Sequence, residues 1–213
     1  MDLTTWRQQL ESGVDHIKSR DTALKPYVLL FPLPTFQPHT NHYQELVESI
    51  ISQQLSIKAA ATITSRFVDL FGGTFPTPEQ ILGTNIEALR SVGLSAQKAA
   101  YIRDLADHVL TGRLRFDAID DMTNDDIIAM LTDVKGIGEW TAHMFLIFSL
   151  GRLDVLAHGD LGVRNAARAL YGLETLPDKA ALENLAEQHG WRGYESIACW
   201  YLWKSLDNEP LKN

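Results

Sequence analysis

The sequence Leu131-Thr-Asp-Val-Lys-Gly-Ile-Gly-Glu-Trp-Thr-Ala-His-Met-Phe-Leu-Ile-Phe-Ser-Leu-Gly151 predicts two helices joined by a tight turn. Just ahead of it, Thr123 stands three residues before the carboxylate of Asp126, which is the capping signal of a helix that begins near Asn124. This first helix carries apolar residues and then meets the segment Lys-Gly-Ile-Gly. We therefore expect it to end there.

Two glycines flanking one apolar residue form the turn between these helices. Gly136 and Gly138 allow backbone conformations that a side chain would forbid, and they expose amide groups. Glu139 then opens the second helix, where the positive end of the helix dipole favours a carboxylate, and Gly151 ends it. The pattern is typical of a helix-hairpin-helix that holds a DNA phosphate with its amides. An ordinary αα-hairpin with a glycine turn fits it as well.

The rest of the chain also reads as helices, because no run alternates with a period of two for long enough to predict a strand. Apolar periodicity and capping signals predict helices over residues 3–20, 42–51, 59–71, 78 onward, 84–93, 95–112, 161–171, 178–189 and 193–206. Four prolines make residues 26–38 extended or looped, with Tyr27, Leu29, Leu30 and Phe31 packing as an irregular arm. The predicted fold class is all-α.

Composition limits the chain's class and location. With 213 residues and 45% hydrophobic content, the chain can bury a core as one domain or two small lobes. Cys199 is the one cysteine, which excludes an internal disulfide and a four-cysteine iron–sulfur cluster. The amino terminus has no basic or apolar leader, and no stretch approaches membrane-spanning length. We expect an intracellular protein with no membrane partner.

The net charge of −8 argues against DNA binding at first sight, because phosphate contacts need Lys and Arg. The charge is unevenly spread, however. Residues 117–133 hold six aspartates and no base, whereas residues 58–115 hold seven bases and five acids. A small footprint held largely by hairpin amides tolerates an acidic back face, with modest affinity and little non-specific binding.

A carboxylate follows the hairpin after about twenty residues, in Asp154-Val-Leu-Ala-His-Gly-Asp160-Leu-Gly-Val-Arg164, at the expected start of another helix. Most aspartates at such positions are plain helix caps. Taken with the hairpin, Asp160 resembles the catalytic aspartate of the helix-hairpin-helix superfamily of DNA base-excision glycosylases, in its alkylpurine (3-methyladenine glycosylase) branch. The resemblance covers residues 41–203.

That resemblance implies a fold and a reaction. The fold would be two helical lobes with an active-site cleft between them. Residues 39–151 would form a central lobe ending in the hairpin, residues 152–213 a lobe that carries Asp160, and residues 1–38 would pack on the latter. The reaction would be hydrolysis of the N-glycosidic bond of an alkylated purine, such as 3-methyladenine or 7-methylguanine, in double-stranded DNA. It would require no cofactor, and we expect a monomer that acts wherever the cell keeps its DNA.

Trp140 occupies the position at which bifunctional members of that superfamily carry a Schiff-base lysine. A tryptophan cannot attack C1′, so the resemblance implies a monofunctional enzyme that leaves an abasic site in an uncut strand. By the same resemblance, Trp140 and Trp200 are walls of the base pocket and Met144 lines it. For Trp200 on its crowded apolar helix, core packing is an equal alternative.

The resemblance also assigns contacts to DNA. Gln54 would be the wedge that fills the space of the extracted base, with Ser56 as a groove contact beside it, although a Gln-Gln pair at a helix junction also suits a solvated corner. Backbone contacts fall to Lys135, Gly136, Gly138 and Lys98. A monovalent cation, Na⁺ or K⁺, would bind the backbone carbonyls of Thr132, Val134 and Ile137.

The chain departs from the branch at the site itself. Gly159 precedes Asp160 where a second acid is common, His158 stands before it, and Met144 replaces a pocket tyrosine. These changes bear on which lesions are removed. Two alternatives remain: a non-catalytic, structure-specific DNA-binding module that uses the hairpin alone, and a helical scaffold in which the hairpin is only a turn.

Overall fold

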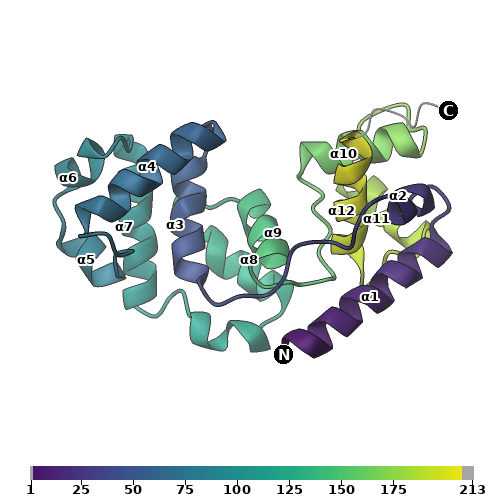
Figure 1. The fold of residues 1–213 in the computed structure, drawn as a ribbon, viewed down its shortest axis with the longest axis horizontal. Coiled ribbons are helices and arrows are strands. Elements are labelled where there is room, and N and C mark those ends of the chain that lie inside the picture. The colour runs from purple at the N-terminus through teal and green to yellow at the C-terminus, as the bar shows by residue number, and fades with distance from the viewer. Residues whose placement is uncertain (1, 208–213) are drawn as a thin grey trace. The chain divides into compact units, whose positions relative to one another are not determined.

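The computed structural model describes residues 2–207, and within that range the chain is helical, with no strand (Figure 1). The predicted all-α class is confirmed. The elements are α1 (Leu3–Arg20), α2 (Lys25–Leu30), α3 (His42–Ser52), α4 (Ile57–Leu70), α5 (Pro78–Gly83), α6 (Ile86–Ser91), α7 (Ala96–Leu110), the 3-10 helix η1 (Phe116–Asp121), α8 (Asn124–Thr132), α9 (Glu139–Phe148), α10 (Leu161–Leu170), α11 (Lys179–Gln188) and α12 (Glu195–Leu206). None of these helices is both long and apolar enough to span a membrane.

Local capping chemistry sets where several of these helices begin. Thr123 accepts the amide of Asp126 at the start of α8, as the sequence predicts. Thr77 and Gln80 form the complete capping box of α5, with each side chain bonded to the other's backbone. These caps satisfy amides that have no partner inside the helix, so they fix where each helix begins.

Two segments differ from the sequence prediction. Residues 25–30 form the short helix α2 rather than an extended segment, because Pro26 stands in its first turn, where a missing amide costs nothing. Val28 is the buried residue of this helix, whereas Leu29 is 68% exposed, so the expected packing of Leu29 and Leu30 is wrong. The second segment is η1, which the sequence analysis did not predict.

The chain divides into two compact units, which we call the central unit (Thr40–Ala142) and the terminal unit (the chain up to His39 and from His143 onward). The division falls inside α9, whereas the sequence placed a boundary after Gly151. A physical reason is that the latter half of α9 belongs to the core of the terminal unit, where Leu146 and Ile147 are fully buried. The amide of His39 donates to the carbonyl of Ser149 at 3.1 Å.

The central unit is built around α7, which packs against α3, α5 and α6. Ile102, Leu105 and Ala106 are fully buried on its apolar face, as the periodicity predicted. Polar residues of α7, such as Lys98 and Arg103, bond to the ends of other helices.

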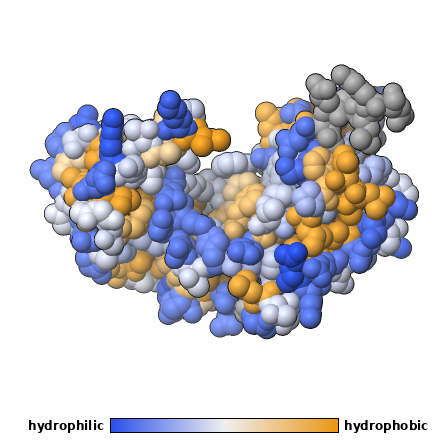
Figure 2. All heavy atoms as spheres, in the orientation of Figure 1, coloured by the Kyte–Doolittle hydropathy of each residue, from blue (hydrophilic) through white to orange (hydrophobic). Residues whose placement is uncertain are grey.

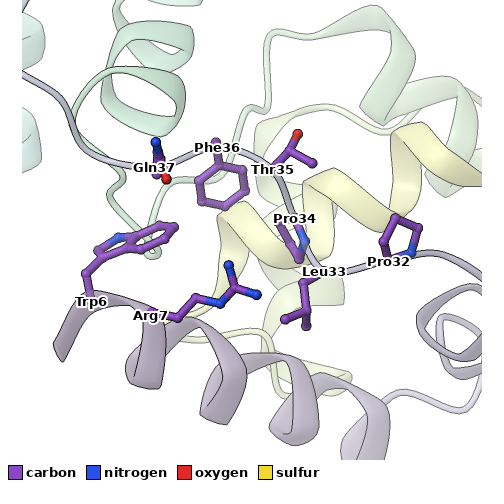
Figure 3. A pocket seen from close by; sticks show the side chains of 8 residues that line it. All are labelled: Trp6, Arg7, Pro32, Leu33, Pro34, Thr35, Phe36 and Gln37. Carbon is purple, nitrogen blue, oxygen red and sulfur yellow. The ribbon is translucent and has the colours of Figure 1, made fainter. Parts of the chain in front are cut away.

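The terminal unit is built around α12, which packs against α1, α2 and α10. The irregular segment after α2 runs beside α1, and its Phe36 meets the ring of Trp6 edge-on at 6.1 Å (Figure 3). Trp6 also donates its indole N–H to the carbonyl of Gly151 at 2.7 Å. Between α1 and residues 32–37 lies an open groove of about 490 Å³. These contacts fix the segment that follows α9.

A buried carboxylate that follows α1 binds side chains from the later part of the terminal unit. Asp21 is fully buried after α1, and it accepts the hydroxyl of Tyr171 at 2.6 Å and the indole N–H of Trp191 at 2.7 Å. It also accepts the amide of Leu24 at 2.9 Å. Burial, reinforced by the bond to Asp21, raises the pKa of the Tyr171 hydroxyl far above its usual range, so this hydroxyl stays a donor.

We expect Asp21→Ala to lower the free energy of unfolding by about 3–5 kcal/mol, because it removes the acceptor of the Tyr171 hydroxyl, the Trp191 indole and the Leu24 amide. Denaturant unfolding measures this loss. The control is Asp2→Ala, which removes the exposed cap that accepts the amides of Thr4 and Thr5 and should cost about 1 kcal/mol. Equal losses in the two variants would show that the buried carboxylate has no special role.

Candidate active site

Asp160 caps α10, as its position in the sequence suggests. Its Oδ1 accepts the amide of Val163 at 2.9 Å, and the side chain lies at the positive end of the helix dipole. The same Oδ1 accepts the indole N–H of Trp203 at 2.8 Å. The carboxylate is half-buried. It is therefore held in one orientation by two donors from different helices while part of it remains open to solvent.

Trp203 is the residue that sequence reasoning missed at this site. It comes from α12, and its ring stacks on Phe148 with centroids 5.8 Å apart. Gly162 makes room for the contact, because a Cβ there would lie 2.9 Å from Asp160 Oδ1 and 3.1 Å from Trp203 Cδ1. A usable signal was present, because Trp203 lies three residues after Trp200 on the same side of the helix and could have been named with it.

Trp200 is half-buried in the same unit, with its ring edge-on to Phe36 at 6.0 Å and 5.4 Å from the ammonium of Lys204. Its indole N–H is buried and has no hydrogen-bond partner within residues 2–207. The indole that reaches Asp160 is that of Trp203. The role of Trp200 as a wall of the base pocket stays a prediction.

Trp140 and Met144 lie one turn apart on α9, on the same side of the helix. Trp140 is 49% exposed, and Met144 is half-buried. A large aromatic ring left so open, on a helix whose neighbouring residues Thr141 and Ala142 are buried, is typical of a surface that contacts a ligand.

Two histidines of the terminal unit contact each other, one on α9 and one two residues before Asp160 in the sequence. The rings of His143 and His158 are edge-on with centroids 4.9 Å apart. Imidazoles are common metal ligands. One member of this pair, His158, is two residues from Asp160 in the sequence. Cys199, also near, is buried, and burial raises the pKa of its thiol to about 12. A thiol of that pKa is not a nucleophile at neutral pH.

The hairpin of the central unit runs from Asp133 to Gly138. Gly136 has a positive φ of 87°, and the ring of Tyr101 fills the space that a side chain at this position would need. Gly138 is exposed, has an ordinary φ and faces open space. The amides of Gly136 and Gly138 make no hydrogen bond to another residue within 2–207. Both amides are therefore free to bind an anion.

The turn between α3 and α4 carries the residues predicted to enter the minor groove. Gln54 is exposed and has a φ of 57°, a left-handed conformation that side chains rarely adopt. The Ser56 hydroxyl accepts the amide of Ala59 at 3.3 Å and so caps α4. Apolar atoms reach the surface around the start of α4, where Ile57 is 92% exposed (Figure 2). Sequence reasoning did not identify this apolar surface.

The two lysines predicted to contact the DNA backbone differ in their surroundings. Lys135 lies on the hairpin with 76% of its side chain exposed, and its ammonium is 3.5 Å from Asp104. Lys98 donates to the carbonyls of Ile51 and Gln53 at 2.8 and 2.7 Å, and burial lowers the pKa of its ammonium. Lys135 is open to a phosphate, whereas the Lys98 ammonium is already engaged inside the central unit.

The predicted cation site consists of the carbonyls of Thr132, at the end of α8, and of Val134 and Ile137, in the hairpin before α9. Oxygen-only donors fit a hard cation such as Na⁺ or K⁺ in their chemistry. The Val134 carbonyl also accepts the amide of Ile137 at 3.1 Å, which leaves it one lone pair for an ion.

The geometry of the hairpin and of Asp160 agrees with a family match. A family model described as "HhH-GPD superfamily base excision DNA repair protein" matches residues 47–190. The chain belongs to this superfamily. The matched region holds the hairpin, the turn around Gln54, and Asp160, whereas Trp200 and Trp203 lie beyond it.

Several relatives of this HhH-GPD chain are named as DNA-3-methyladenine glycosylases. DNA-3-methyladenine glycosylase 1 of Schizosaccharomyces pombe is 38% identical over 165 residues, which are 76% of this chain and 72% of the relative. A crystal structure of DNA-3-methyladenine glycosidase from Bacillus halodurans matches with a TM-score of 0.82 and 42% identity, covering 91% of this chain and 88% of that one. The S. pombe 3-methyladenine DNA glycosylase Mag1, in complex with abasic DNA, matches with a TM-score of 0.77 and 33% identity, covering 95% and 100%.

For this HhH-GPD chain, we expect Trp203→Phe to slow base excision about tenfold, because it removes one hydrogen bond to a charged group while keeping an aromatic ring beside Phe148. Single-turnover excision measures the rate. The control is Trp6→Phe, which also removes an indole hydrogen bond, to Gly151, and should cost stability but not rate. A similar rate loss in both variants would contradict a specific role for Trp203.

Proposed function

We propose that this chain is a monofunctional DNA glycosylase that hydrolyses the N-glycosidic bond of alkylated purines in double-stranded DNA. The observation that carries the proposal is the carboxylate of Asp160, fixed by the Val163 amide and the Trp203 indole and partly exposed to solvent. The relatives named DNA-3-methyladenine glycosylase support alkylated purines as the substrate class. The product is an abasic site.

The reaction needs a negative charge placed beside the sugar. As the bond between C1′ and the base breaks, the base takes the bonding electrons and the sugar becomes an oxocarbenium ion. A fixed carboxylate stabilises this cation without having to reorganise, and it can accept the proton of the water that adds to C1′. Asp160 supplies that charge. A purine methylated at N3 or N7 is already cationic, so it leaves as a neutral base and needs no acid.

Trp140 supports both the substrate class and the chemical outcome. Its exposed ring offers a π face on which a cationic purine can stack, with an attraction of roughly 0.5–2 kcal/mol. Met144, one turn along α9, would line the same pocket with a polarizable thioether, and Trp200 would form a second wall. A tryptophan has no amine, so Trp140 cannot form a Schiff base with C1′.

Binding to the DNA backbone would use backbone amides and few charged side chains. The free amides of Gly136 and Gly138 would bind a phosphate, with the exposed ammonium of Lys135 beside them. Gln54 would enter the space left by the extracted base, and Ser56 would contact the groove next to it. The partner is therefore double-stranded DNA that contains an alkylated base, bound by a monomer that acts where the cell keeps its DNA.

The proposed reaction requires no cofactor. A Na⁺ or K⁺ ion on the carbonyls of Thr132, Val134 and Ile137 would add positive charge next to the hairpin amides. Such an ion would strengthen phosphate binding and take no part in bond breaking.

We expect Asp160→Asn to lose at least about 100-fold in single-turnover base release from a methylated duplex, because the neutral amide cannot stabilise the oxocarbenium ion. The amide oxygen can still accept from Val163 and Trp203, so folding and affinity for the duplex should be kept. Base release by the variant close to the wild-type rate would exclude Asp160 from the chemistry. Tight binding without release by the wild-type protein would instead indicate a DNA-binding module.

The product strand should remain uncut until hot alkali is added, and borohydride should trap no protein–DNA adduct during turnover, because no imine forms at Trp140. Denaturing electrophoresis separates these outcomes. Trp140→Phe should keep this chemistry and slow the release of cationic bases most, since its smaller ring attracts a cation less. A trapped adduct with the wild-type protein would contradict the assignment and point to Lys135.

A further inference from the structure

A polar stripe on α7 connects the two segments of the central unit that the proposed function assigns to DNA. One is the turn of residues 53–56, which we call the wedge turn, and the other is the hairpin of residues 133–138. Lys98 bonds to the wedge turn, whereas Tyr101 and Asp104 contact the hairpin. These three residues recur at every third position, so they lie along one side of the helix.

Lys98 binds the end of α3 from which the wedge turn starts. Its ammonium donates to the carbonyls of Ile51 and Gln53, at 2.8 and 2.7 Å. The last carbonyls of a helix have no partner inside the helix and lie at the negative end of its dipole, so a cation satisfies both needs. Two of the three N–H donors of Lys98 are thereby used within the protein.

The backbone of the wedge turn has a strained conformation that neighbouring contacts must stabilise. Gln54 is the one residue other than glycine with a positive φ within residues 2–207. A side chain in this conformation is strained, and such strain persists where neighbouring contacts fix the backbone. Those contacts are present on both sides, since Lys98 binds the carbonyl of Gln53 and Ser56 caps the helix that follows.

The wedge turn is also tied to the hairpin. Gln53 donates its side-chain amide to the carbonyl of Gly136 at 2.8 Å. On the other side of the hairpin, the ring of Tyr101 lies against Gly136, and Asp104 accepts the amide of Lys135 at 2.9 Å. The hairpin therefore cannot shift relative to the wedge turn without breaking contacts with α7.

We propose that Lys98 is a positioning residue: by binding the carbonyls before Gln54 it holds the wedge in register with the amides of the hairpin that bind phosphate. This role takes the place of the phosphate contact predicted for Lys98, and it rests on the proposed function. Because Lys98 acts through Gln54, it governs capture of the extrahelical base. Lys98 itself makes no contact with a DNA phosphate, so its loss leaves the electrostatic attraction between protein and duplex unchanged.

The test compares Lys98→Met with a matched control, Arg103→Met. Arg103 is also on α7 and donates to the carbonyls of Ile81 and Thr84 around the end of α5, away from the wedge turn and the hairpin. The readouts are single-turnover base release from a duplex with one methylated purine, and fluorescence of 2-aminopurine placed next to that purine, which reports base capture whether or not the bond is cut. Base release by the wild-type protein tests the proposed function separately.

We expect Lys98→Met to reduce capture and release by about ten- to a hundredfold, the usual effect of a misplaced group, while Arg103→Met changes neither. In Gln54→Gly, which has no wedge to position, adding Lys98→Met should cost less than about twofold more. The slope of log affinity against log salt for undamaged duplex should equal that of the wild type.

Three results would overturn the proposal. An equal loss from Lys98→Met with and without Gln54 would indicate general structural damage. A salt slope reduced by about 0.9 would indicate a direct phosphate contact. Unchanged capture and release would leave Lys98 as a helix cap only. Should Lys98→Met not fold, Gln53→Leu removes only the link to Gly136, and the same dependence on Gln54 is expected of it.

Discussion

The hydrogen bonds to the carboxylate of Asp160 connect the fold to the proposed chemistry. The carboxylate accepts the Val163 amide at the start of α10 and the Trp203 indole from α12, so one side chain caps a helix and joins two elements of the terminal unit. These two hydrogen bonds also fix the orientation of the carboxylate, which the proposed reaction requires. A charge that is already oriented costs no reorganisation when the sugar becomes cationic, which is the condition for electrostatic catalysis.

The central unit carries the proposed contacts to the DNA backbone, although the chain has a net charge of −8. Its hairpin presents backbone amides rather than a basic patch. The ammonium of Lys98 binds carbonyls at the end of α3. Recognition then depends on geometry more than on long-range attraction. We therefore expect weak binding to undamaged DNA.

Much of the fold follows from local signals in the sequence. Capping residues such as Thr77, Ser95 and Thr123 act within one turn, so the starts of their helices could be predicted from sequence alone. The helix α2 could not, because a proline reads equally as a break and as a first helical residue. The division inside α9 was also missed, since only tertiary packing shows which core its buried residues join.

The site was partly predictable for the same reason. Asp160 and the hairpin glycines are recognisable by spacing along the chain. The bond from Trp203 to Asp160 joins residues 43 positions apart, and the ammonium of Lys98 reaches carbonyls 45 and 47 positions away. Contacts of that kind depend on how helices pack, which no local pattern encodes. The strain at Gln54 is likewise visible only in the backbone.

Whether this chain breaks a glycosidic bond in alkylated DNA is tested most directly by identifying what the wild-type protein releases from a methylated duplex. Mass spectrometry of the soluble fraction should find free methylated purines, with an equal number of abasic sites in the DNA and no release of unmodified purines. A duplex that is bound but yields no free base would contradict glycosylase activity.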